Sequence, residues 1–294
     1  MMEYQTNKPE NSSNETIVFS TADTARRKIK TRLWKRDRVI SWGIVLLLFS
    51  ITVYTLINMD YGSTVLFDAV RQFFSSIFQV FARPQLSGRV AFSVLLQALS
   101  VTIALSVLTT IISSFVAFFF SLFVARNLGN GLFSQGIRMF MSFIRAVPTI
   151  LWVMIFSILI GLGSNAAVIG MAFHGVAYLT KVYAESIEEI DEGVIEALRA
   201  CGGSWWHIVF QAVFPSCLTT ILSWTFLRFE INFTNAVAVG AAAGAGGLGF
   251  QLVMASGFYF DFRELGVIVY LILAIVLLLE IISLKLKKKY LVKT

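Results

Sequence analysis

The chain has 294 residues, of which 57% are hydrophobic and 14% are charged, and its mean hydropathy is +0.77. Charged residues make up about a quarter of an ordinary soluble domain, so this composition excludes a soluble globular protein and indicates a chain built for lipid. The net charge of +7 comes from Lys and Arg residues that flank apolar stretches, which argues against a nucleic-acid-binding face.

The N-terminal tail, residues 1–38, is polar and then basic. Residues 1–25 are rich in Asn, Ser, Thr and Glu, so we expect them to be disordered. A basic run, RRKIKTRLWKRDR, then precedes the uncharged segment Val39–Asn58. That segment is longer than a typical signal-peptide core and has no obvious small-residue cleavage site, which predicts a retained first membrane span.

An amphipathic helix is predicted after the first span. Apolar residues recur there at helical spacing, with polar residues between them, until Arg83–Pro84. We expect this helix to lie on the external membrane face, so that residues 39–89 hold the first span and this helix. The apolar positions are Leu66, Phe67, Val70, Phe73, Phe74, Ile77, Phe78 and Phe81.

The core of the chain, residues 90–284, begins with a long uncharged segment, Val90–Ala125, which predicts a second span. Apolar sequence from Met139 to Thr180 is too long for one span. The stretch GLGSN (Gly161–Asn165) is the natural break, so we expect spans three and four to form a tight hairpin there.

Two further spans complete the expected fold, which is an all-α polytopic membrane protein with about six transmembrane helices. A fifth span follows Pro215, and a sixth runs from about Leu265 to Leu284. Basic residues crowd the N-terminal flank and the C-terminal tail, residues 285–294, so both termini are expected in the cytoplasm. The same charge would attract anionic membrane lipid. Cys201 and Cys217 then fall in the cytoplasm or just inside the membrane, and we interpret both as packing thiols.

The segment between spans four and five is acidic and amphipathic. Its apolar residues share one helical face, and Glu and Asp residues cover the others. Gly202–Gly203 ends this helix, and a second short helix is expected up to Pro215. One interpretation is a connector that rests on its own bundle. The apolar positions are Ile187, Ile190, Val194, Ile195 and Leu198.

The spacing within this segment favours a second interpretation. Glu196–Ala197, Gly202 and Pro215 resemble the E-A-A, Gly and Leu-Pro pattern in the permease subunits of bacterial ABC importers. This copy has Leu198 for the second Ala, Ala212 where Ile is usual, and Phe214 before the Pro. The resemblance implies a type I permease fold in which a coupling helix, about 185–215, sits in a groove of a cytoplasmic ATPase.

Three further stretches are similar to the permeases of phosphonate-type importers: FIRAVPTILW (Phe143–Trp152), KVYAESIEEID (Lys181–Asp191) and LRFEINFTNAVAVGAAAGAGGLG (Leu227–Gly249). In such relatives a basic residue often follows the Asn of the F-E-x-N stretch, whereas here Thr234 follows Asn232–Phe233, and this difference bears on the substrate. The resemblance implies a homodimer in the bacterial cytoplasmic membrane, an ABC ATPase dimer, an extracytoplasmic solute-binding protein, and transport by alternating access. Another small solute remains the alternative.

The stretch GAGGLG fits G-x-G-x-x-G, but no strand–helix context supports a dinucleotide site. The chain also has no G-x-x-x-x-G-K-[ST] motif, so we expect it to bind no cofactor and assign ATP and Mg²⁺ to the partner ATPase. The glycines either line the solute path as irregular chain or allow close helix packing. They are Gly244, Gly246, Gly247 and Gly249.

Ionisable residues inside spans are costly and usually face a cavity or a partner. In span five, Arg228, Glu230 and Asn232 are candidates for the solute path. Arg228 and Glu230 are two residues apart and should not pair with each other, so the alternative is a structural ion pair to another helix. Arg145 and the nearby Pro148 are further candidates for the solute path, and Arg145 either reaches the cytoplasmic surface or contacts an anion.

The two histidines are interpreted as structural. His174 is expected to be a hydrogen-bonded packing residue, and His207 an interfacial residue of the coupling region. The sequence has no metal-ligand spacing and no convincing Ser/His/Asp set, so we predict neither a metal site nor a catalytic residue. A membrane-embedded enzyme would need a cluster of polar catalytic residues, and none is evident in this sequence. A channel or scaffold would give the acidic helix around Glu196 no function.

Overall fold

The computed structural model describes residues 36–58, 66–129 and 131–290, and within these ranges the chain is helical with no strand. This confirms the all-α fold expected from the sequence. The chain divides into two compact units, residues 1–64 and 65–294. Most of the predicted N-terminal tail and the last residues of the C-terminal tail lie outside the described ranges.

The first unit contributes one helix, α1 (Arg36–Asn58). Its stretch Val39–Asn58 has a mean hydropathy of 2.2, and none of the residues tested there is buried within the chain. Thr52 and Thr55 donate their hydroxyl hydrogens to the carbonyl oxygens of Leu48 and Ile51, at 2.9 and 2.8 Å. An apolar helix that satisfies its own polar groups suits a lipid environment, as expected for the first span.

In the second unit, α2 (Leu66–Ala82) is the expected amphipathic helix and packs against α11 (Phe262–Tyr290). The Tyr270 hydroxyl donates to the Phe81 carbonyl oxygen at 2.7 Å. Asp261 accepts backbone N–H groups at the start of α11, and the buried Glu264 accepts a hydrogen bond from Ser87. These contacts fix the beginning of the last span.

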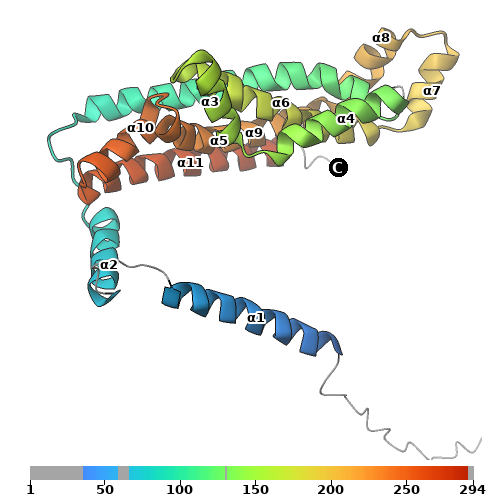
Figure 1. The fold of residues 1–294 in the computed structure, drawn as a ribbon. Helices are drawn as coiled ribbons and strands as arrows, with labels where there is room; N and C mark the ends of the chain where they lie inside the picture. Colours follow the sequence, from blue (N-terminus) through green and yellow to red (C-terminus); the bar gives the residue numbers. More distant parts are fainter. Residues whose placement is uncertain (1–35, 59–65, 130, 291–294) are drawn as a thin grey trace, which may run out of the picture. The chain divides into compact units, whose positions relative to one another are not determined.

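Three long helices form the centre of the second unit: α3 (Phe92–Val124), α6 (Ser164–Glu188) and α9 (Phe214–Ala242) (Figure 1). Small residues let α3 and α6 approach closely, because a Cβ added to Gly175 would lie 2.3 Å from Ser113 Oγ. The hydroxyl of Ser113 donates to Thr109 and Ala172 carbonyl oxygens. Close backbone contact and internal hydroxyl bonds stabilise this core where water is absent.

The expected third span is broken. The chain forms α4 (Gly131–Ala146) and α5 (Thr149–Ile160), which meet at an angle of 91°. Pro148 has no N–H and restricts the residue before it, so the helix stops at Ala146. Twelve residues of α5 span only about 18 Å, less than the hydrocarbon thickness of a bilayer. The α4–α5 pair is therefore one bent span or a re-entrant segment.

The predicted hairpin between α5 and α6 is present, and the chain turns at Gly161–Gly163, where Gly161 and Gly163 have positive φ. Five helices are long and apolar enough to cross a membrane, and a sixth span results if α4 and α5 count as one. The described part of the chain therefore agrees with about six spans.

The acidic segment does not form the expected single helix. Helix α6 continues to Glu188, and a separate helix, α7 (Glu192–Ala200), then begins in a new direction. Asp191 caps α7 and prevents one continuous helix. After α8 (Trp205–Ile208), a π turn, η1 (Val209–Val213), leads directly into α9. The short helix expected to end at Pro215 is thus part of one 38-residue helix, Trp205–Ala242.

After α9, the glycine loop leads into α10 (Gly247–Val253) and a second π turn, η2 (Met254–Phe258). This short apolar element packs against α3 and α9 before the chain enters α11 (Figure 1).

Candidate functional site

A compact knob, residues 191–208, extends from the end of the bundle where α3 and α6 finish (Figure 1). We call it the α7–α8 knob. Its turns are fixed by local hydrogen bonds: Asp191 Oδ1 accepts from Gly193 N at 2.9 Å, and Ser204 forms a capping box with His207. Gly202 has φ +78°, which L side chains rarely adopt, and its N–H donates to the Arg199 carbonyl oxygen. The knob therefore has a defined shape.

The knob is also fixed to the bundle. Arg199 Nη2 donates to the Asn127 carbonyl oxygen at 3.2 Å. The Trp205 ring stacks on Phe123 at a centroid distance of 5.9 Å, and its Nε1–H donates to the Leu128 carbonyl oxygen. The side chains of Ile195 and Ile208 are buried in the core beside α3 and α6. A force on the knob is therefore transmitted directly to the ends of the long helices.

The outer face of the knob is free. Glu196, Ala197 and Gly202 are exposed, and no described residue makes a hydrogen bond or ion pair with the Glu196 carboxylate. A shallow groove beside α7 is lined in part by Ala197, Leu198 and Ala212. Pro215 is exposed but lies beyond η1 in α9. Three of the four predicted coupling residues thus share the knob, and Pro215 belongs to the helix behind it. His207 caps α8 through Ser204.

The structure buries Arg228 midway along α9, with only 2% of the residue exposed. Its guanidinium carbon lies 5.0 Å from the centre of the Tyr178 ring, and Nη2 lies 3.2 Å from His174 Nδ1. His174 also contacts Thr149 Oγ1 at 3.1 Å, as expected for a hydrogen-bonded packing residue. No carboxylate in the described residues pairs with Arg228, and its Nε–H has no hydrogen-bond partner there. The alternative of a structural ion pair is therefore not observed.

Asn232 lies one helical turn beyond Arg228 and is fully buried. Its Nδ2 donates to Thr110 Oγ1 at 2.9 Å, and its Oδ1 accepts no hydrogen bond from the part of the chain that the structure describes. Glu230 is only partly buried and does not pair with Arg228. The core between α3, α6 and α9 thus brings Arg228 and Asn232 together and leaves Glu230 outside this cluster.

The glycine loop favours close packing over a wide solute channel. A Cβ added to Gly249 would lie 1.8 Å from the Val237 carbonyl oxygen, and one added to Gly247 would lie 2.5 Å from Thr102 Oγ1. Gly246 and Gly247 have positive φ, while Gly244, also at positive φ, is exposed and has open space around it. The loop follows helix α9 rather than a strand, so the context of a dinucleotide site is absent from the described chain.

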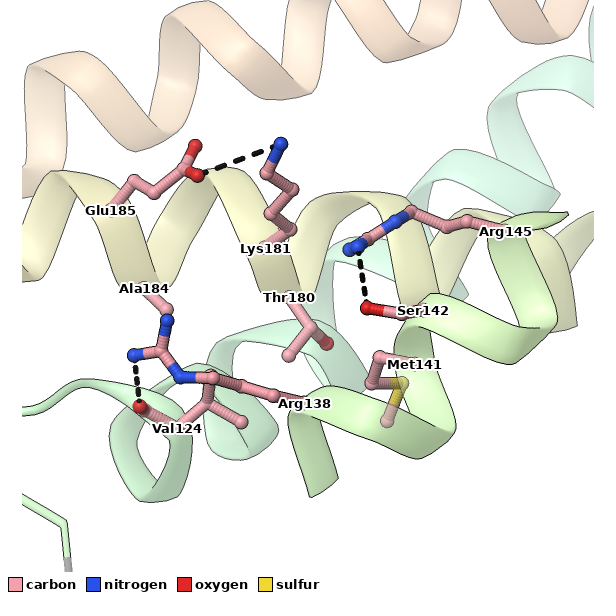
Figure 2. A pocket seen from close by; sticks show the side chains of 9 residues that line it. All are labelled: Val124, Arg138, Met141, Ser142, Arg145, Thr180, Lys181, Ala184 and Glu185. Carbon is pink, nitrogen blue, oxygen red and sulfur yellow. Dashed lines mark hydrogen bonds and ion pairs between the residues drawn. The ribbon is translucent and has the colours of Figure 1, made fainter. Parts of the chain in front are cut away.

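Arg145 lines a polar cavity between α4 and α6 (Figure 2). Pro148 is exposed at the bend after α4. Arg138 and Lys181 line the same cavity, and the sequence reasoning missed both. Arg138 and Arg145 are seven residues apart on an amphipathic helix, which places them on one face and was the available signal. No group of residues in the described ranges is suited to hold a metal ion.

The helical bundle, the exposed knob and the buried polar core together define a polytopic helical membrane protein. Residues 117–293 match the family of binding-protein-dependent transport system inner membrane components, and the chain belongs to that family. It is therefore a multi-pass component of an ABC transport system.

Two relatives with named transport functions are similar to this chain in sequence. The chain is 30% identical over 250 residues to the phosphate-import permease protein PhnE of Mycolicibacterium smegmatis, which covers 84% of this chain and 46% of that relative. It is 32% identical over 197 residues to the phosphite transport system permease protein PtxC of Stutzerimonas stutzeri, covering 67% and 70%. The chain thus spans about half the length of the first relative.

Solved structures show the same fold at low sequence identity. The MetNI methionine ABC transporter in an inward-facing conformation has a TM-score of 0.61 and 19% identity, covering 67% of this chain and 96% of that chain. A bacterial alginate ABC transporter in complex with a pentasaccharide-bound periplasmic protein has a TM-score of 0.56 and 12% identity, covering 90% and 99%. Both likenesses agree with the type I importer permease fold.

Proposed function

We propose that this chain is the permease subunit of an ATP-driven importer that carries a phosphonate or a related phosphorus oxyanion across the bacterial cytoplasmic membrane by alternating access. The α7–α8 knob carries this proposal, because it is exposed, rigid and joined without a break to the helix that holds Arg228. A channel or scaffold gives no reason for such an element.

The proposed partners follow from the same arrangement. A cytoplasmic ABC ATPase dimer would receive the knobs and would hold ATP and Mg²⁺, since the sequence of this chain has no P-loop motif. A second copy of the chain would complete the solute path, and an extracytoplasmic binding protein would deliver the solute. With the knob in the cytoplasm, both termini face the same side.

The substrate class rests on shared chemistry. Relatives are named for phosphate, phosphite and phosphonate transport, and these solutes share a tetrahedral, negatively charged phosphorus centre. Arg228 supplies a buried guanidinium without a carboxylate partner in the described chain, and such a group favours an anion over a neutral or cationic solute.

The mechanism would couple two conformations to two states of the ATPase. Closure of the ATPase dimer on ATP would draw the two knobs together, and the rigid contacts of Arg199 and Trp205 would carry that motion into α3 and α9. Nucleotide shifts the equilibrium only as far as its complex with the ATPase favours one arrangement of the spans over the other. The buried Arg228–Asn232 cluster would then face opposite sides of the membrane in turn.

A charge reversal on the knob tests the proposal. We expect Glu196→Lys to lower ATPase co-purification and ATP-driven uptake, because an exposed carboxylate on the docking face becomes a cation. Glu189→Lys is the matched control, since Glu189 is also exposed but lies outside α7. Equal ATPase recovery from Glu196→Lys and the unmodified chain would contradict the proposed docking face.

Competition for uptake tests the substrate class. Methylphosphonate, phosphite and phosphate should each compete with the transported solute, and methionine should not. Competition by methionine but by none of the phosphorus oxyanions would exclude the proposed class while leaving the ATPase-coupled mechanism intact.

A further inference from the structure

The cavity between α4 and α6 is a second basic site, separate from the buried Arg228 cluster. It has a volume of about 200 Å³ and is lined by side chains from the end of α3, from α4 and from α6 (Figure 2). A water molecule occupies about 30 Å³ of liquid, so the cavity has room for one small tetrahedral ion and a few waters. The lining residues are Val124, Arg138, Met141, Ser142, Arg145, Thr180, Lys181, Ala184 and Glu185.

The charges that line the cavity are mostly positive. Arg138 pairs with Glu188 and donates to the Val124 carbonyl oxygen at 2.7 Å, so this guanidinium mainly closes the end of α3. Lys181 Nζ lies 3.6 Å from Glu185 Oε1, and both side chains are about half exposed, which makes a loose pair. Arg145 has no carboxylate partner in the described chain and donates to the Ala177 carbonyl oxygen and to Ser142 Oγ.

Thr180 gives an independent indication of a ligand. Only 1% of this residue is exposed, and its Oγ1 has no hydrogen-bond partner among the described residues, although Thr180 lines the cavity. Buried hydroxyls on α3 behave differently, since those of Ser106 and Thr110 donate to carbonyl oxygens one turn earlier. A buried hydroxyl without a partner costs about 1–3 kcal/mol, and an acceptor in the cavity would remove that cost.

We propose that this cavity binds one phosphate-type oxyanion, held by Arg145 and Lys181 and by a hydrogen bond from Thr180. The anion belongs either to a free ion such as inorganic phosphate or to the headgroup of a phospholipid. The inference rests on the proposed function for its cytoplasmic location and deepens it, because a free ion here is the imported product at the exit end of the permease.

The position of the cavity connects it with the ATPase-coupling end. The Arg126 backbone N–H donates to Glu188 Oε1, and Asn127 Nδ2 donates to the Ile187 carbonyl oxygen. Asn127 also accepts the hydrogen bond from Arg199 of the knob. The cavity lining includes Val124, at the end of α3, and the knob is hydrogen-bonded to Asn127 in the turn that follows. An anion between α4 and α6 would therefore lie near the point where the knob joins the bundle.

The test uses the full chain purified together with its ATPase partner in phosphatidylcholine nanodiscs and titrated with inorganic phosphate by calorimetry. Arg145→Gln should weaken phosphate binding about tenfold, because a charge-assisted hydrogen bond is lost. Thr180→Val should weaken it about threefold, because a neutral hydrogen bond is lost without a change in shape. Lys181→Gln should also weaken it, because Lys181 lines the same cavity.

Arg126→Gln is the matched control, since it removes one positive charge at the same end of the bundle from a side chain that does not line the cavity. Equal weakening by Arg126→Gln and Arg145→Gln, or no weakening by any cavity variant, would overturn the inference. Should phosphate not bind, native mass spectrometry of the complex distinguishes the lipid source: retained phospholipid that is lost in Arg145→Gln supports a headgroup site, and no retained lipid overturns the inference.

The two proposals fail separately. Recovery of the ATPase with the tagged chain is scored on the same preparation. An intact complex that binds no phosphate and retains no phospholipid rejects the cavity site alone, whereas phosphate binding by a chain that recovers no ATPase rejects the importer function alone.

Discussion

Arg228 places a guanidinium inside the protein, midway along α9 and in contact with an aromatic ring and an imidazole. Burying a cation without a carboxylate partner is unfavourable, and a cation–π contact offsets only part of the cost, about 2 kcal/mol when desolvated. The buried Arg228 therefore does not stabilise the folded chain, and stability alone does not explain why this position holds an Arg. The anion proposed as the transported solute would give this buried charge a function.

The first prediction concerns this residue. Arg228→Met should leave folding intact or improve it, because an apolar side chain of similar length replaces an unpaired buried charge. Transport of the phosphorus oxyanion should fall at least about tenfold, the effect of losing one charge-assisted contact. Thermal unfolding of the detergent-solubilised chain and vesicle uptake measure the two effects. A variant that fails to fold and a variant that transports normally would each contradict the anion-binding role.

The second prediction concerns the glycine loop. Gly249→Ala should destabilise the chain by at least about 1–3 kcal/mol, because the new Cβ would overlap the Val237 carbonyl oxygen in the neighbouring helix. Gly136→Ala is the control, since that glycine lies in α4 with open space around it and should gain helix propensity. The fraction of monodisperse protein and the midpoint of thermal unfolding report the difference. Equal stability of the two variants would argue against close packing of the loop.

At the scale of elements, the turn between α7 and α8 sets the direction of the knob. Gly202 holds φ +78° there, and no atom lies within 4 Å of an added Cβ, so backbone strain rather than a clash limits the side chain. A β-carbon in the left-handed region costs about 1–2 kcal/mol, and Asn tolerates that region better than Leu.

The third prediction follows from this geometry. Gly202→Leu should reduce ATPase association and uptake more than Gly202→Asn, although the two side chains are close in size. Co-purification of the ATPase with each variant measures the effect. A loss of similar size in both variants would point to direct contact at the exposed Gly202 surface instead of the turn geometry.

Some elements were predictable because their signal is local. Val39–Asn58 is apolar on every side, α2 repeats at helical spacing, and the glycines at Gly161–Gly163 mark a turn. The break at Pro148 was missed because apolar sequence continues on both sides of it. The start of α7 was missed because the period from Ile187 to Leu198 runs through the turn, and only the cap at Asp191 reveals it.

The candidate site shows the same division between local and distant information. Glu196, Ala197 and Gly202 were found because their spacing resembles the pattern of ABC importer permeases, and they share one knob. The neighbours of Arg228 come from α6, 50 or more residues away, so no short pattern could predict the His174 and Tyr178 contacts. The cavity of Arg145 combines residues of three helices for the same reason.

At the scale of the whole molecule, two native cysteines test the proposed orientation. Cys201 is exposed in the knob, and Cys217 is buried in α9. The fourth prediction is that a membrane-impermeant maleimide labels Cys201 in inverted membrane vesicles but not in intact spheroplasts, because the proposed orientation places the knob in the cytoplasm. Cys217 should react only after denaturation. Labelling of Cys201 from outside the cell would reverse the topology and exclude the ATPase-docking role.

One continuous helix, Trp205–Ala242, connects the knob with the buried guanidinium of Arg228, so a rotation of the helix at the knob moves the guanidinium. From Trp205 to Arg228 the axis measures about 35 Å at 1.5 Å per residue. Tilting this helix by one degree about its Trp205 end therefore displaces the guanidinium by about 0.6 Å, a distance set by the length of the helix between the two residues. The π turn at Val209–Val213 lies within this helix, between the knob and the guanidinium. In the proposed transport cycle, motion of the knob would reach Arg228 through those five residues.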